Sequence, residues 1–297
     1  MNAIRCKQCQ QEFEVNAASR EILGKLDCPL PALCFACATQ NGLTYRNERH
    51  LYRRDCELCK KSILAMYAPG SYIHVYCRDC WFSDNWDPIS LGRDYDPKRP
   101  FMEQFFELLH EVPQFNFRQI GTNENAEYSN NIYNAKNVFL GWSIVAAENI
   151  AFSKNVDSCN DCVDCLDVQK SELLYNCVDT SESFQSAYLT RVSKCSDCFF
   201  CRDLEDCQNC FGSVNLRHKK FCWFNERLSE IDYRAKVGQA FSSRQSLEEV
   251  ADRFAAFSSE SPVEYATIRN SENVTGEYLR GDSNAQCCFE SYESENI

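Results

Sequence analysis

The cysteines are the residues of this chain best suited to chemistry, and the first eight form four Cys-x2-Cys pairs. They are Cys6, Cys9, Cys34, Cys37, Cys56, Cys59, Cys77 and Cys80. A Cys-x2-Cys turn places two sulfurs on one side of a knuckle, and two knuckles complete a tetrahedron around zinc at Zn–S distances of about 2.3 Å. We therefore predict two structural zinc ions, one for each successive group of four.

The spacing within each group supports a zinc-ribbon-like module. The second group leaves 17 residues between its pairs, as zinc ribbons do, and the first leaves 24. Four cysteines leave no open coordination position, so the metal is expected to be structural rather than catalytic. Free thiols or bound iron are the alternatives. Cys28 lies outside the pairs and is expected to be a spare thiol.

Composition and charge limit the cellular setting. The chain has 297 residues, 21 of them cysteine, a density typical of disulfide scaffolds or metal proteins. We see no signal-peptide core and no apolar run of about 18 residues, so we expect a cytoplasmic protein without a membrane span. Residues 1–61 carry ten Lys/Arg against seven Asp/Glu, whereas residues 228–297 carry six against thirteen. The two ends are therefore expected to meet different partners.

A twelve-residue period runs from residue 120 to residue 227. Its first column reads Ile120, Ile132, Ile144, Val156, Val168, Thr180, Val192, Leu204 and Leu216. Three further columns, at steps of three, also hold mostly small or apolar residues. A fixed period with a constant inward set predicts a β-solenoid (a parallel β-helix) of nine twelve-residue coils.

Ten more cysteines fall in the inward columns. Two triplets have the spacing of bacterial iron–sulfur ligands: Cys159, Cys162 and Cys165, then Cys195, Cys198 and Cys201. No Cys-Pro follows either triplet, and the same columns hold Val138, Ile150 and Leu174 in other rows. This exchange favours cysteine as a small core residue. Cluster ligation and disulfides remain alternatives.

The outward positions predict corners and an aromatic ladder. Asn or Asp recurs six residues apart, as at Asn125 and Asn131, which suits two corners per coil. Aromatic residues recur on one outward face, among them Phe139, Phe152 and Tyr175. We expect this apolar strip either to pack under a following helical segment or to bind a partner.

The whole chain is predicted to be mainly β, with helices flanking the solenoid. Pro100 begins a helix with apolar residues at 101, 105, 108 and 109, expected to seal the first coil. The predicted segments are zinc modules at 1–50 and 51–99, a capping helix and linker at 100–119, the solenoid at 120–227, a helical segment at 228–260, and the start of a second solenoid segment at 261–297.

The link between the zinc modules is basic. Arg46, Arg49, Arg53 and Arg54, with neighbouring tyrosines, could grip phosphates and stack on bases. The alternative is a solvated link whose arginines pair with acidic neighbours such as Glu57.

Four ordered motifs resemble a known family. They are Tyr-Arg-Asn-Glu-Arg-His-Leu-Tyr-Arg-Arg-Asp-Cys, Trp-Phe-Ser-Asp-Asn-Trp-Asp-Pro, Gly-Arg-Asp-Tyr-Asp and Arg-Pro-Phe-Met-Glu-Gln-Phe. The chain is similar to an uncharacterised family of bacterial proteins that joins N-terminal zinc ribbons to a Cys- and Asn-rich repeat region. The resemblance implies zinc at the eight cysteines named above, followed by the repeats, and it implies no activity.

No catalytic motif stands out in the sequence: we find no nucleophile elbow, His-Glu-x-x-His, Walker loop or dinucleotide fingerprint. We therefore predict a non-enzymatic, zinc-stabilised scaffold that recognises a macromolecule through its zinc head and solenoid face. The alternatives are a nucleic-acid-binding or DNA-mimic protein, and an iron–sulfur redox protein that uses the cysteine triplets. The partner, protein or nucleic acid, and the oligomeric state stay open.

Overall fold

The computed structural model describes residues 3–43 and 50–296 and is mainly β. The chain divides into two compact units, residues 1–47 with 262–297, and residues 48–261. No helix in the described ranges is both long and apolar enough to cross a membrane.

The first unit contains a two-stranded hairpin and a small parallel sheet. Its elements are β1 (Ile4–Arg5), β2 (Glu12–Phe13), α1 (Ala17–Lys25), α2 (Phe35–Leu43), β21 (Ile268–Arg269), β22 (Gly276–Arg280) and β23 (Cys288–Tyr292). β1 and β2 pair antiparallel. β22 pairs in parallel with β23 at a spacing of twelve residues, so that Gly276 lies opposite Cys288. The twelve-residue spacing thus recurs between β22 and β23, whereas β21 pairs in parallel with β22 eleven residues apart, with Ile268 opposite Leu279.

The second unit begins with a similar hairpin. Its first elements are β3 (Tyr52–Asp55), β4 (Ser62–Ala65), β5 (Val75–Tyr76), α3 (Arg78–Trp81), the 3-10 helix η1 (Pro88–Leu91), α4 (Phe101–Glu111) and β6 (Gln114–Phe115). β3 and β4 pair antiparallel, and β5 pairs in parallel with β6. The β5–β6 pair joins the hairpin region to the segment that leads into the large sheet.

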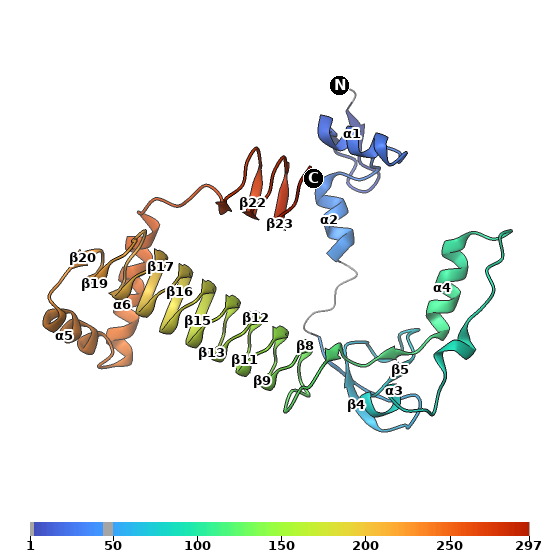
Figure 1. The fold of residues 1–297 in the computed structure, drawn as a ribbon, viewed down its shortest axis with the longest axis horizontal. Helices are drawn as coiled ribbons and strands as arrows, with labels where there is room; N and C mark the ends of the chain where they lie inside the picture. Colours follow the sequence, from blue (N-terminus) through green and yellow to red (C-terminus); the bar gives the residue numbers. More distant parts are fainter. Residues whose placement is uncertain (1–2, 44–49, 297) are drawn as a thin grey trace. The chain divides into compact units, whose positions relative to one another are not determined.

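A fourteen-stranded sheet fills the rest of this unit (Figure 1). Its strands are β7 (Gln119–Ile120), β8 (Asn130–Tyr133), β9 (Lys136–Phe139), β10 (Trp142–Val145), β11 (Glu148–Ala151), β12 (Lys154–Asp157), β13 (Asn160–Val163), β14 (Leu166–Gln169), β15 (Glu172–Ser181), β16 (Phe184–Ser193), β17 (Ser196–Glu205), β18 (Gln208–Phe211), β19 (Lys220–Trp223) and β20 (Glu226–Arg227). From β8 to β19 the pairing is parallel, with partners twelve residues apart, as between Ile144 and Val156. The period in the sequence is therefore the register of the sheet. We call each twelve-residue stretch a row.

Each row has four left-handed residues, where the sequence predicts two corners. Every third residue from Asn131 to Phe224 has a φ between 47° and 62°. Asn and Asp occupy many of these positions, and their side chains bond from row to row. Asn125 donates to Asn137 at 2.9 Å, and Asn137 donates to Asn149 at 2.8 Å. The other left-handed positions hold residues such as Leu140 and Phe152, whose type does not indicate a turn in the sequence.

The predicted inward columns are buried except at the two ends. Ile132 and Ile144 are 2% exposed or less, but Ile120 is 53% exposed. The reason is a shift of register, because β7 places Gln119, not Ile120, opposite Ile132. The Gln119 amide instead closes the first row by donating to two carbonyls, those of Ala126 and Ser129, at 3.0 Å each.

The last row also departs from the expected pattern. Lys219 and Asn225 belong to inward columns in the sequence but are exposed. After Trp223 the chain turns back, and β20 pairs antiparallel with β19, placing Arg227 opposite Cys222. The ninth row therefore does not close.

Two helices cover part of the aromatic face. α5 (Glu230–Ala240) and α6 (Arg244–Ser259) occupy the predicted helical segment. Their residues Tyr233, Leu247 and Phe254 pack in one cluster with Phe211 and Trp223 of the sheet. The prediction that a following helical segment covers the aromatic face is confirmed for these last rows.

The predicted helix at residue 100 exists but does not seal the sheet. α4 spans Phe101–Glu111. Phe101 is 60% exposed and Phe105 is 44% exposed, and no residue of α4 is buried. Arg99–Glu107 and Arg93–Glu111 ion pairs hold the helix to the loop before it. Among the described residues, Phe101 and Phe105 thus lie largely open, with Tyr95 beside Phe101 at 6.3 Å, whereas Leu108 and Leu109 are half-buried.

Candidate metal centres and interior thiols

The first four-cysteine group is built from a hairpin turn and a helix start. The turn after β1 carries Cys6 and Cys9, while Cys34 and Cys37 lie just before and within the first turn of α2. All four sulfurs lie within 4.8 Å of one another, with Cys9 and Cys34 Sγ 3.7 Å apart. These four residues could hold one metal ion.

The second group repeats this construction. Cys56 and Cys59 lie in the turn between β3 and β4, Cys77 immediately precedes α3, and Cys80 lies within it. The four sulfurs again lie within 4.8 Å of one another, and Cys59 and Cys77 Sγ are 3.8 Å apart. The structure thus brings together all eight predicted cysteines in the predicted fours.

The second pair of each group differs from a second knuckle because it sits at the start of a helix. The N-terminal end of a helix favours negative charge, which suits thiolate ligands. Backbone N–H groups add to this, since those of Cys34 and Cys77 donate to the sulfurs of Cys6 and Cys56 at 3.3 Å each.

These N–H groups shift the thiol pKa values. The donor from Cys34 is the main cause that lowers the pKa of Cys6 to about 6. For Cys56, burial opposes ionisation, yet donors from Cys59 and Cys77 lower the pKa to about 6. Burial raises the pKa of Cys37 to about 12. One sulfur of each group is therefore set up as a thiolate, and a bound cation would favour ionisation of the others.

The basic link contributes one internal residue and one exposed residue. Arg54 donates to Glu57 at 2.8 Å and to the Ile73 carbonyl at 3.1 Å, and its side chain is 9% exposed. This guanidinium is committed to holding the second module together, as the acidic-neighbour alternative expects. Arg53 is exposed, whereas Arg46 and Arg49 lie outside the described residues.

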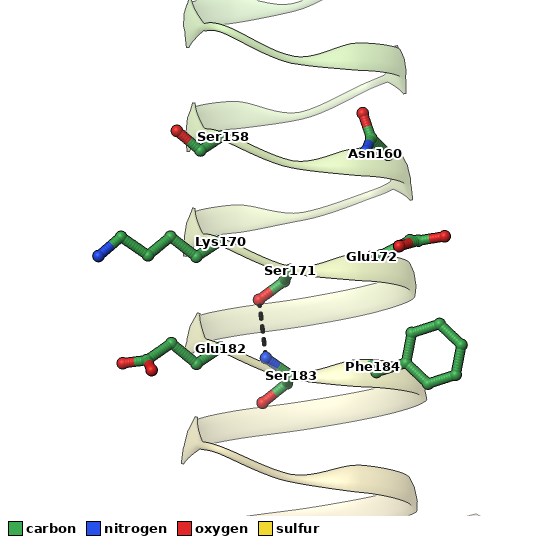
Figure 2. A pocket seen from close by; sticks show the side chains of 8 residues that line it. All are labelled: Ser158, Asn160, Lys170, Ser171, Glu172, Glu182, Ser183 and Phe184. Atoms are coloured by element: carbon green, nitrogen blue, oxygen red, sulfur yellow. Dashed lines mark hydrogen bonds between the residues drawn. The ribbon is translucent and has the colours of Figure 1, made fainter.

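The ten inward cysteines are buried and bonded to the backbone. In one column, Cys159 Sγ donates to the Asp157 carbonyl at 3.2 Å and accepts the N–H of Ser171 at 3.4 Å. Ser171 makes the same two bonds through its hydroxyl, to the Gln169 carbonyl and from the Ser183 N–H (Figure 2). Cysteine and serine therefore have the same structural role in this column. Both fill the narrow interior, and both form hydrogen bonds with backbone N–H and carbonyl groups of neighbouring rows.

The cysteine triplets do not form a third compact donor group. In residues 3–43 and 50–296, groups of three or more such ligand atoms within 4.8 Å of one another occur only at the two four-cysteine sites. The triplet sulfurs point instead toward carbonyls of their own row, as Cys165 does toward Val163 at 3.3 Å. This arrangement favours the core interpretation of the inward thiols.

Cys195 offers a test of the hydrogen-bonding role. Its sulfur accepts the N–H of Cys207 at 3.3 Å. Cys195→Ser keeps an acceptor and should change the free energy of unfolding little. Cys195→Val leaves a buried N–H unsatisfied and should cost about 1–3 kcal/mol. Urea unfolding of both variants measures the difference, and a valine variant as stable as the serine variant would mean that the thiol only fills space.

An open groove of about 530 Å³ runs along one side of the middle rows. In Figure 2, Lys170 and Glu182 stand along one edge and Glu172 and Phe184 along the other. Their side chains point away from one another rather than toward a common centre. The groove therefore presents no convergent set of catalytic groups.

Comparison with known proteins gives no further information on these sites. No family model, no curated protein and no solved structure matches the chain.

Proposed function

We propose that the two four-cysteine groups each bind one structural zinc ion. Tetrahedral sets of four thiolates suit zinc or iron, and zinc is the common occupant of closed four-cysteine sites built from short Cys-x2-Cys turns. The sulfur spacing supports this assignment. The ions would stabilise small modules that have few other core residues.

We further propose that residues 120–227 form a β-solenoid of twelve-residue coils. The twelve-residue register, the left-handed residue at every third position and the row-to-row Asn bonds support it. The parallel strands β21 to β23 are then a short second segment of the same kind.

The function that this architecture supports best is non-enzymatic recognition of a macromolecule through one face of the solenoid. We define the aromatic strip as the outward residues on that face. Its open part comprises Tyr128, Phe139, Phe152 and Tyr175, which are 46%, 46%, 53% and 44% exposed; its covered part comprises Phe200, Phe211 and Trp223, which are 8% exposed or less. This contrast carries the proposal, because one strip that needs helical cover at one end lies open at the other.

Site-specific photo-crosslinking tests the proposal. A photoreactive phenylalanine analogue at Phe139 or Phe152 should crosslink a macromolecule in host lysate. The same analogue at Tyr133 or Val145, which are also exposed but lie on another face, serves as the matched control. Equal yields from both faces, or no adduct from the strip, would contradict recognition through the strip.

A further inference from the structure

A second apolar surface in the same unit also lacks a cover among the described residues. On α4, Phe101, Phe105 and Leu108 follow one another at steps of four and three, which places them on one face of the helix. The two phenylalanines are 60% and 44% exposed, and their rings stack at 6.0 Å. An amphipathic helix with this much exposed aromatic surface needs an apolar partner.

The chain already contains an example of the missing interaction. α6 lays Leu247, Val250 and Phe254 against the covered part of the aromatic strip, and Phe254 lies 6.2 Å from Phe200. These three residues follow at steps of three and four, like those of α4. The strip therefore accepts helices whose apolar residues have this spacing.

The covered part of the strip continues into the open part at Tyr175. Tyr175 lies 5.4 Å from Tyr188, which stacks on Phe200 at 4.4 Å. At the far end, Phe139 lies 5.7 Å from Tyr128 and 5.5 Å from Phe152. One row, with Val163 and the exposed Asp164, separates these three rings from Tyr175. A second helix that begins at Tyr175 would thus extend an interface that already exists and would cross this row to reach Phe152.

The length of α4 is close to the length of the strip between Phe139 and Tyr175. Phe139 and Tyr175 are three rows apart, or roughly 14 Å at about 4.8 Å per row. The eleven residues of α4 span about 16 Å at 1.5 Å per residue. One α4 can therefore cover the strip from Phe139 to Tyr175 without extending over the covered part, and Tyr128 lies about one row beyond it.

Within one copy of the chain, α4 is held against other residues and does not lie on the aromatic strip. Its C-terminal end contacts Tyr72 through His110, with ring centroids 4.2 Å apart, and Arg93 pairs with Glu111. After two intervening residues β6 begins, and it is fixed by pairing with β5. The helix is thus anchored to the second four-cysteine module, with its apolar face outward.

We propose that the aromatic strip binds α4 of a second copy of this chain, and that two copies exchange their α4 helices reciprocally. This inference rests on the proposed role of the strip in recognition and names its partner. Each dimer would contain two equivalent helix-on-strip contacts, as a two-fold interface requires.

The test is the mass of the full zinc-loaded chain in solution, by analytical ultracentrifugation. Wild type should sediment at twice the 34.3 kDa chain mass. The α4 variant Phe101→Glu/Phe105→Glu and the strip variant Phe139→Glu/Phe152→Glu should each be monomeric, with dissociation constants raised about 30-fold or more. The matched control Tyr133→Glu/Val145→Glu alters another exposed face and should remain dimeric.

Mixing supplies the decisive result. An equimolar mixture of the α4 and strip variants should form heterodimers that keep one of the two contacts, where the intact helix of one copy meets the intact strip of the other. These heterodimers should be weaker than the wild-type dimer but tighter than a pair of identical variants. Zinc content and circular dichroism equal to wild type confirm that each variant is folded. A dimeric α4 variant beside a monomeric strip variant would mean that two strips pair, and would overturn the exchange. A mixture that associates no more tightly than either variant alone would overturn it as well.

A monomeric wild type would also overturn the inference, but not the proposed function. In that case the crosslinking at Phe139 and Phe152 decides separately. A strip-specific adduct with a different macromolecule would leave recognition through the strip standing while its partner is reassigned.

Discussion

Cys77→Ser should reduce the bound zinc from two ions per chain to one and unfold the second module. The reason is that three of the four proposed ligands, Cys56, Cys77 and Cys80, form a buried cluster against which only Leu58, Ile63 and Tyr76 pack. The other fully buried apolar residues of the module are the small side chains of Ala65 and Val75. Without the ion, a unit with so few apolar contacts lacks the free energy to stay ordered. Plasma mass spectrometry gives the zinc count.

Limited proteolysis locates the damage. New cleavage sites should appear between residues 50 and 85 in the Cys77→Ser variant, while the large sheet stays resistant. Cys28→Ser is the matched control, because Cys28 is an exposed cysteine outside both groups, and it should keep both ions. A Cys77→Ser protein that still binds two ions per chain would refute the assignment of Cys77 as a ligand.

Asp203→Ala should lower the free energy of unfolding of the second unit by about 3 kcal/mol. The Asp203 carboxylate is 5% exposed and accepts from Arg191 at 2.6 and 3.0 Å and from Arg202 at 3.1 Å. Arg202 also donates to the Ser258 carbonyl at 2.9 Å, at the end of α6. Removing the carboxylate leaves two poorly hydrated cations side by side and loosens the helix that covers the strip.

Urea unfolding measures this loss, and Asp206→Ala provides the comparison. Asp206 pairs with His218 at 2.7 Å, also across twelve residues, but both side chains are more than 60% exposed. An exposed pair of this kind contributes at most about 1 kcal/mol. Equal destabilisation by the two substitutions would mean that burial does not set the strength of these row-to-row pairs.

The period and the interior of the sheet could be predicted because they leave a repeated trace in the sequence. A narrow interior accepts small or aliphatic side chains, so columns such as that of Ile144 and Val156 are nearly uniform. The ends could not be predicted in this way. Ile120 fits its column by type, but the pairing of β7 moves it outward, and only the hydrogen bonds of Gln119 reveal the change.

The corners show a different limit. Asn and Asp mark only some of the left-handed positions, because their side chains tolerate that conformation and bond along the ladder. Leu140, Phe152 and Tyr188 adopt it as well, although an isolated L-residue is disfavoured there by roughly 1–2 kcal/mol. Row-to-row hydrogen bonds and ring stacking override this local preference, and such long-range terms cannot be seen in single residues.

The two four-cysteine groups could be predicted from the sequence, but the local structure around them could not. The pair spacing identifies the eight cysteines. It does not reveal that helices begin directly after Cys34 and Cys77, because these short segments have no strong helical pattern in the sequence. The basic link likewise gives no sign that Arg54 turns inward to Glu57. The charge of the Arg54 side chain is compatible with either solvent exposure or an internal ion pair. The geometry of the hairpin determines that the ion pair forms.

The constant register of the sheet makes its length adjustable in whole rows. Because Asn ladders, inward columns and left-handed positions all recur after twelve residues, removing or duplicating one row would restore every contact except those at the cut. Shifts of one residue occur where the register is broken, at the entry through Gln119 and between Ile268 and Leu279, which are paired eleven apart. Gene duplication in units of 36 bases could therefore lengthen the sheet without redesigning its interior.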